Sequence, residues 1–191
     1  MTAMPDVPAG ANAVNPFIIT DDAATVIDFI VDVFGAKDVP EARTLDTDGL
    51  ILHSELRLGD SLLMVADRKP GWPFTPAFTR VYVDDVEATL SRAQARGARI
   101  VTRPTDFFGE TLSRFQDPSG NLWWVYRHAP SASGSSEWPG ESRTDGADGP
   151  WSDESGGDGA EDWSSFSTPE LEYVHRTLVD AMSSLRDPKA R

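Results

Sequence analysis

The spacing of apolar side chains along the chain alternates between a helical period and a strand-like period. Residues 23–34 and 86–96 place apolar side chains three and four positions apart, which predicts two helices with one buried face each. Each run follows two adjacent aspartates that can cap a helix, and each ends at a glycine. Runs rich in β-branched and aromatic residues predict strands at residues 14–20, 43–45, 50–58, 61–66, 78–83, 100–102, 111–116 and 122–126.

These elements occur twice in the same order. Asp21-Asp22 lies 63 positions before Asp84-Asp85, and Gly35 lies 62 positions before Gly97. A repeat of this length predicts two β-α-β-β-β units that are stable only together, because neither buries its apolar faces alone. The sequence therefore predicts an α+β domain over residues 13–128.

The last two strands of the second unit are predicted to form a hairpin around Asp117-Pro118-Ser119-Gly120-Asn121. Pro118 fixes φ near −65°, Gly120 tolerates a positive φ, and Asp117 and Asn121 can bond their own backbone. This turn is a strong structural signal and a weak functional one.

The chain outside the domain has a different composition. Residues 1–12 are predicted to be disordered, and residues 129–166 to be an acidic disordered linker that buries too little apolar surface to offset its ordering entropy. Trp138, Trp151 and Trp163 interrupt the linker, which indicates either transient contacts with the domain or a recognition segment or flap. Residues 167–187 predict a helix, capped at Ser167 or Thr168, that could dock on the domain, on a second copy or on another protein; its apolar stripe is Leu171, Val174, Leu178, Met182 and Leu185.

Charge and cysteine content narrow the classes of partner. The net charge of −14 argues against nucleic acid and anionic membrane surfaces, which would repel the chain. Residues 137–162 hold nine acidic residues and one basic residue, a net charge of −8, so the remainder is only mildly acidic. There is no cysteine, which excludes disulfides and thiolate sites. No signal peptide or membrane-spanning run is recognised, and a cytoplasmic location is expected by default.

The paired units carry marks of a known family. Phe34-Gly35-Ala36 after the first helix, Val83-Asp84-Asp85 before the second and residues 117–123, DPSGNLW, resemble the vicinal oxygen chelate superfamily. That superfamily includes glyoxalase I, fosfomycin-resistance transferases, extradiol dioxygenases and bleomycin-resistance proteins. The resemblance covers about residues 13–128 and implies a cup-shaped, mixed or antiparallel sheet, usually completed in a homodimer.

The resemblance also implies where a divalent metal ion would be held. Metalloenzymes of the family take ligands from the first and the last strand of each unit. Carried onto this sequence, those positions are Asn15, Leu63 or Met64, Phe78 and Trp124. Only the Asn15 amide is a usable donor, so we expect no metal cofactor and lean against an enzyme.

The same positions predict an apolar pocket for a small aromatic or amphipathic molecule. Aromatic walls with a few polar groups are typical of such sites, and period-two alternation places neighbouring side chains on the same faces. For Phe17, Leu63 and Leu122 a place in the core is favoured over the pocket. For Asn15 and Arg80 the two interpretations are even. The predicted ligand-binding residues are Asn15, Phe17, Met64, Phe78, Arg80, Tyr82, Trp124 and Tyr126.

Other polar residues support chemistry less well. His53, Glu55 and Arg57 alternate along one strand and could form a base or metal site, but a solvated outer face is favoured. His128 and His175 are interpreted in the same way, and Glu110 and Asp106 flank a predicted loop at the cavity mouth. Two alternatives to metal-free binding stay open: a metalloenzyme of glyoxalase or dioxygenase type, and an interaction module that acts through the tail.

Overall fold

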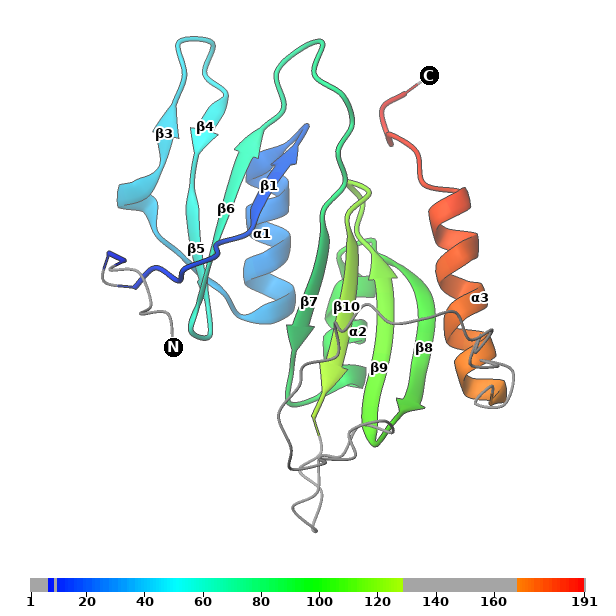
Figure 1. The fold of residues 1–191 in the computed structure, drawn as a ribbon. Helices are drawn as coiled ribbons and strands as arrows, with labels where there is room; N and C mark the ends of the chain where they lie inside the picture. The colour runs from blue at the N-terminus through cyan, green and yellow to red at the C-terminus, as the bar shows by residue number, and fades with distance from the viewer. Residues whose placement is uncertain (1–6, 9, 129–167, 191) are drawn as a thin grey trace, which may run out of the picture.

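A computed structural model describes residues 7–8, 10–128 and 168–190 of the chain. Two groups of strands lie side by side, with two helices behind them and a third helix at the C-terminal edge (Figure 1). Two segments were predicted to be disordered. Residues 1–12 lie largely outside the described residues, and residues 129–166, with the three tryptophans of the linker, lie wholly outside them. The elements are β1 (Phe17–Thr20), α1 (Ala23–Phe34), β2 (Lys37–Asp38), the 3-10 turn Pro40–Ala42, β3 (Thr44–Leu45), β4 (Ile51–His53), β5 (Glu55–Leu58), β6 (Ser61–Asp67), β7 (Phe78–Tyr82), α2 (Val86–Ala95), β8 (Arg99–Phe107), β9 (Glu110–Gln116), β10 (Leu122–Arg127) and α3 (Pro169–Ser183).

Both predicted units are present, and each forms its own four-stranded sheet. The strand orders are β1-β6-β5-β2 and β7-β10-β9-β8. In each sheet the first strand pairs in parallel with the last strand, and the other neighbours are antiparallel. The α+β class and the repeat are therefore confirmed, because the two units share one topology.

The first unit contains an insertion that the prediction missed. The expected second strand, residues 43–45, instead pairs with β4 in a separate two-stranded ribbon, and the short β2 pairs with β5 in its place. The expected strand 50–58 is also divided, at Ser54. The fully buried Ser54 donates from Oγ to the Val65 carbonyl at 2.5 Å, so a buried hydroxyl is satisfied where the strand changes partner.

The first helix has the bounds that its sequence predicts. Asp22 caps the N-terminus by accepting from the Thr25 N–H at 3.0 Å. Gly35 ends the helix in the left-handed region, with φ 72°, and donates its N–H to the Val31 carbonyl. The buried face of α1 packs with α2 and the inner faces of both sheets into one core; its members are Ala23, Val26, Ile27, Phe29, Ile30 and Val33.

A buried carboxylate organises the turn between β9 and β10. Asp117 Oδ2 accepts from Trp123 Nε1 and from Asn121 Nδ2, both at 2.9 Å, and its Oδ1 accepts from the Asn121 N–H. Burial raises the pKa of Asp117, against the opposing effect of the hydrogen bonds from Trp123 and Asn121. Gly120 has φ 91°, and a Cβ at that position would lie 2.8 Å from a ring carbon of Phe74. The turn is therefore fixed by side chains as well as by backbone preference.

The C-terminal helix docks on its own domain beside β8 (Figure 1). Thr168 caps it by accepting from the Leu171 N–H at 3.3 Å. The buried positions are Val174 and Ala181, whereas Met182 is 44% exposed, so the buried face is rotated from the predicted stripe. The sequence left open whether this helix docks on the domain, on a second copy or on another protein, and in the structure it packs on the second sheet of its own domain.

Candidate functional site

The second sheet presents a continuous row of rings on the side turned away from α1 and α2. In the parallel pairing of β7 with β10, Arg80 lies opposite Trp124 and Tyr82 lies opposite Tyr126. Opposite residues point to the same side of a sheet, and residues two apart on a strand share that side. We call this surface the aromatic face and define it as Phe78, Arg80, Tyr82, Trp124 and Tyr126.

The side chains of the aromatic face contact one another. The ring centroids of Phe78 and Trp124 lie 6.0 Å apart, and those of Tyr82 and Tyr126 lie 5.7 Å apart. The Arg80 guanidinium carbon lies 4.6 Å from the Tyr126 ring centroid, which is within range of a cation–π interaction. Phe78 and Tyr82 are 51% and 54% exposed. The structure thus brings five of the eight predicted ligand-binding residues together on one surface.

Arg114 belongs to the same side of the sheet and was not among the predicted residues. It lies on β9 opposite Trp124, and its guanidinium carbon is 5.3 Å from the Trp124 ring centroid. Only 5% of the residue is exposed, and burial lowers the pKa of its guanidinium. Nη1 donates to the Val174 carbonyl at 2.8 Å and to Thr102 Oγ1 at 3.2 Å, while the buried Nε has no partner among the described residues. Counting outward from the predicted hairpin turn could have paired Arg114 with Trp124.

The helix α3 walls this region on the side of β8. Thr177 Oγ1 lies 2.8 Å from Thr102 Oγ1, and the Tyr173 hydroxyl accepts from the Arg103 N–H at 2.9 Å. Val174 packs with Leu112 and Tyr126 in a small cluster separate from the main core. One edge of the aromatic face is therefore closed by a segment from the C-terminal end of the chain.

The three predicted residues of the first unit lie apart from the aromatic face: Phe17 and Met64 pair on the first sheet, and Asn15 precedes β1. Phe17 pairs with Met64 on neighbouring strands and is 50% exposed, so the favoured expectation that it belongs to the core is wrong. The Asn15 amide is held in a local turn, where Oδ1 accepts from the Asn12 N–H and Nδ2 donates to the Asn12 carbonyl. Leu63 and Leu122 are 3% and 1% exposed and belong to the buried interior.

The positions at which the fold family implies a metal ion do not fit one. Both polar atoms of the Asn15 amide already have backbone partners, and Phe78, Trp124 and Leu63 offer no donor. Within residues 7–8, 10–128 and 168–190 no group of three His, Asp or Glu side chains is arranged to hold a metal ion. The donor set of this chain therefore gives no support for metal chemistry at those positions.

The remaining candidates form pairs on the surface. His53 Nε2 lies 3.4 Å from Glu55 Oε1, and His128 Nδ1 lies 3.0 Å from Glu110 Oε1. Arg57 donates to the Gly10 carbonyl at 2.7 Å. Asp106 and His175 are exposed on β8 and α3. None of these side chains joins the aromatic face except at its margin, where Glu110 begins β9.

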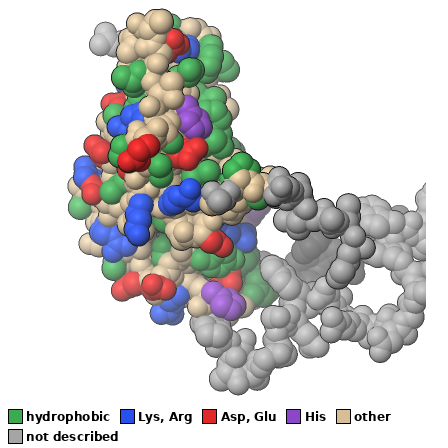
Figure 2. Space-filling view, turned by 90° about the vertical axis from the view of Figure 1, so that its left-hand side faces the viewer, with side chains coloured by type: hydrophobic (Ala, Val, Ile, Leu, Met, Phe, Trp, Pro, Cys, Tyr) green, Lys and Arg blue, Asp and Glu red, His purple; other side chains and the backbone are tan. Residues whose placement is uncertain are grey.

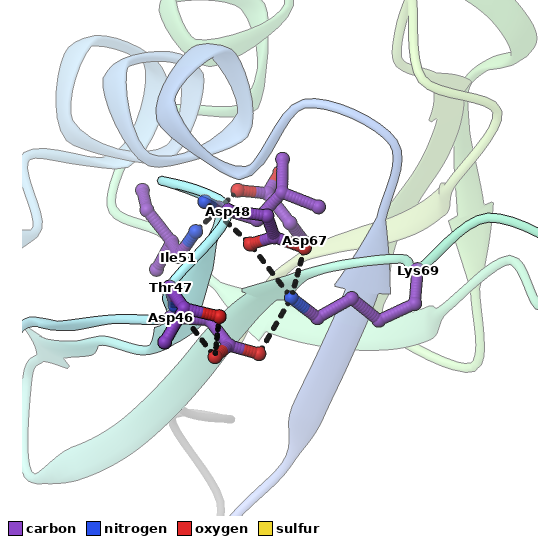
Figure 3. Close-up of polar contacts among 7 residues, drawn as sticks. Asp46, Thr47, Asp48, Ile51, Asp67 and Lys69 are labelled. Carbon is purple, nitrogen blue, oxygen red and sulfur yellow. Dashed lines mark hydrogen bonds and ion pairs between the residues drawn. The ribbon is translucent and has the colours of Figure 1, made fainter.

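A cluster of acidic residues near β4 has a structural role. Lys69 Nζ bonds Asp46 and Asp48 at 2.7 Å, and Asp67 accepts from the Ile51 N–H at 2.7 Å (Figure 3). Asp67 also accepts from the Ala23 N–H at 2.8 Å. Hydrogen bonds from Lys69 lower the pKa of both Asp46 and Asp48. The lysine and the backbone donors satisfy these carboxylates, and the cluster ties the insertion to the first sheet.

The charge of the domain is dispersed. On the side of β3 and β4, basic and acidic side chains are interspersed (Figure 2). The domain thus offers no single-sign surface on this side for a polyanion or a polycation.

Among the described residues, none of the helices combines the length and the apolar composition that crossing a membrane requires.

Comparisons with known proteins agree with this fold. Residues 11–125 match the model of the family described as Glyoxalase/Bleomycin resistance protein/Dioxygenase superfamily. Uncharacterized proteins of Mycobacterium tuberculosis and Mycobacterium bovis are each 32% identical to this chain over 123 residues, or 58% of its length. The match covers 71% of the Mycobacterium tuberculosis protein and 80% of the Mycobacterium bovis protein. Among solved structures, protein PA1353 from Pseudomonas aeruginosa is 20% identical with a TM-score of 0.50, and the match covers 60% of this chain and 96% of that chain.

Proposed function

Because the chain belongs to the Glyoxalase/Bleomycin resistance protein/Dioxygenase superfamily, we propose that it binds a small aromatic or amphipathic molecule on the aromatic face without a metal ion. The observation that carries this proposal is the exposure of Phe78 and Tyr82 beside Trp124 and Tyr126. Fully burying one such ring is worth roughly 1.5–3 kcal/mol, so covering the remaining half of both rings supplies about that amount in total.

The edges of the aromatic face support a site of limited size. Tyr173 and Val174 of α3 bound it on the side of β8, and Arg80 provides a charged group among the rings. Flat apolar walls with one or two placed polar groups are what small-molecule pockets usually offer. This combination favours binding over structural packing alone, because a side chain used only for packing would be buried.

A second copy of the chain is proposed to complete the site. Phe17 on the first sheet and Phe78 on the second are each about half exposed, and both lie on strands at the edge of a sheet. Apolar rings left on two separate surfaces favour association with another copy. The expected result in analytical ultracentrifugation is a dimer, and a monomer at every concentration tested would contradict this part of the proposal.

The binding proposal is tested by a ligand-observed NMR screen of an aromatic fragment library, on the full chain in EDTA. Phe78→Ser and Tyr82→Ser should weaken the best hits about tenfold, because each removes a ring that the ligand covers. Trp72→Ser is the matched control, since Trp72 is 50% exposed and lies in the connector before β7.

Three results would contradict the proposal. Equal losses in the control would mean that the fragments bind exposed rings in general. Hits that require added Ni²⁺, Zn²⁺, Mn²⁺ or Fe²⁺ would favour the metalloenzyme instead. Binding that disappears only when the linker and α3 are deleted, with Phe78 and Tyr82 having no effect, would favour the interaction module.

A further inference from the structure

Two arginines flank one tryptophan across three neighbouring strands of the second sheet. Trp124 on β10 lies opposite Arg80 on β7 and opposite Arg114 on β9. All three side chains therefore stand on the same side of the sheet. The two arginine Cα atoms are separated by two strand spacings, about 10 Å, a span over which long side chains can converge on one small group.

Neither guanidinium has a carboxylate partner among the described residues. Arg80 is exposed, and its guanidinium contact is the face of Tyr126. Arg114 is 95% buried with its Nε unpaired, although protein chains almost always give a buried charge a partner. Before a ligand binds, the Arg114 guanidinium therefore lacks both a carboxylate partner and a full set of hydrogen bonds among the described residues.

Glu110 is the one carboxylate on this side of β7, β9 and β10, and it is already engaged. Glu110 lies four residues before Arg114 on β9, so it shares the same side, and its Oε1 is 3.0 Å from His128 Nδ1. Two guanidinium groups against one paired carboxylate leave the face with an excess of positive charge. That local excess stands out in a chain whose net charge is −14.

The helix α3 holds one of the two arginines in place. The Val174 carbonyl and Thr102 Oγ1 both accept from Arg114 Nη1, which fixes the guanidinium against Trp124. A donor held in one orientation loses little conformational freedom when an anion binds, so its hydrogen bonds contribute more to affinity.

We infer that the aromatic face selects a planar aromatic ligand that carries a carboxylate or similar oxyanion, paired by Arg80 and Arg114 while its ring rests on Phe78 and Tyr82. This inference rests on the proposed function and specifies the class of ligand. Charge-assisted hydrogen bonds to guanidinium are stronger than neutral ones, so charge decides between ligands of equal shape.

The test compares two probes of nearly equal size, 2-naphthoate and neutral 2-naphthamide, by isothermal titration calorimetry on the full chain. The naphthoate should bind about tenfold more tightly. Arg80→Gln and Arg114→Met should each remove most of this preference, measured as the ratio of the two affinities for each variant. Arg127→Gln is the control, because Arg127 lies on the same strand as Trp124 but on the opposite side of the sheet.

The outcomes separate this inference from the proposed function. Equal affinity for both probes, lost in Phe78→Ser, would overturn the anion preference and keep the aromatic site. A preference that Arg127→Gln removes as well would overturn it too, because the effect would then come from net charge. Failure of both probes to bind would contradict the aromatic site itself. Circular dichroism of Arg114→Met confirms that the variant is folded.

Discussion

Replacing Arg114 by methionine should leave the free energy of unfolding unchanged or raise it. Methionine keeps an unbranched, flexible side chain against Trp124 and removes the buried charge. Arg114 is 5% exposed and its Nε has no partner among the described residues. The substitution therefore removes a group whose burial is only partly compensated.

The magnitude follows from the contacts of the guanidinium. Two hydrogen bonds from Nη1 are lost, worth about 1.5–3 kcal/mol each for a charged donor. Their acceptors keep other partners, because Thr177 Oγ1 lies 2.8 Å from Thr102 Oγ1 and donates to the Val174 carbonyl at 3.1 Å. The desolvation penalty that disappears is several kcal/mol. The expected net effect is between zero and a gain of about 2 kcal/mol.

Equilibrium unfolding in urea measures this difference directly. Arg127→Met is the control, because Arg127 is exposed and its removal should change stability by less than about 0.5 kcal/mol. A loss of more than about 1 kcal/mol for Arg114→Met, with an unchanged slope against urea, would refute the reasoning. Arg114 would then be a structural residue. A gain would mean that the chain retains a destabilising charge at a surface proposed to bind an anion.

Three further predictions concern the scaffold. Gly120→Ala should cost about 1–3 kcal/mol, since it combines φ 91° with a Cβ 2.8 Å from a phenylalanine ring carbon, and more than Gly71→Ala, which has φ 84° but open space; calorimetric melting temperatures check the order. Burial raises the pKa of Asp117, so the folded state binds a proton more tightly than the unfolded state does. The free energy of unfolding should therefore fall as pH rises from the ordinary aspartate pKa through the raised pKa. This dependence on pH should flatten in Asp117→Asn, and identical slopes in the two proteins would contradict the prediction. Val174→Asp should cost about 2–4 kcal/mol because it buries an unpaired carboxylate, whereas the half-exposed Val179→Asp on the same helix should cost little; equal urea midpoints would mean that α3 is not docked in solution.

Local signals in the sequence predicted the elements that depend on neighbouring residues. The bounds of α1 follow from an aspartate N-cap and from Gly35, whose positive φ ends the helix. The turn at Asp117 follows from residues that can bond their own backbone. Each of these features is decided within a few residues of chain, so one sequence suffices to locate it.

Features that depend on pairing between distant segments were missed. The short strand β2 takes the place beside β5 that was predicted for residues 43–45, and this choice depends on pairing between separate segments. The break in the strand at Ser54 depends on a hydrogen bond to the Val65 carbonyl on β6. Neither choice leaves a periodic pattern, because a two-residue strand is too short to show one.

The sequence by itself determined the repeat, the family and the rows of rings, because topology and period-two alternation are carried by the order of residues. The tertiary structure decided which rings meet. It separated the aromatic face on the second sheet from Phe17 and Met64 on the first sheet and from Asn15, which precedes β1. It also decided that α3 docks beside β8 and buries Arg114, 60 residues from its acceptor Val174 in the chain. The physical reason is that burial and hydrogen bonding act through distance in space, whereas a sequence pattern reports only the face of its own segment.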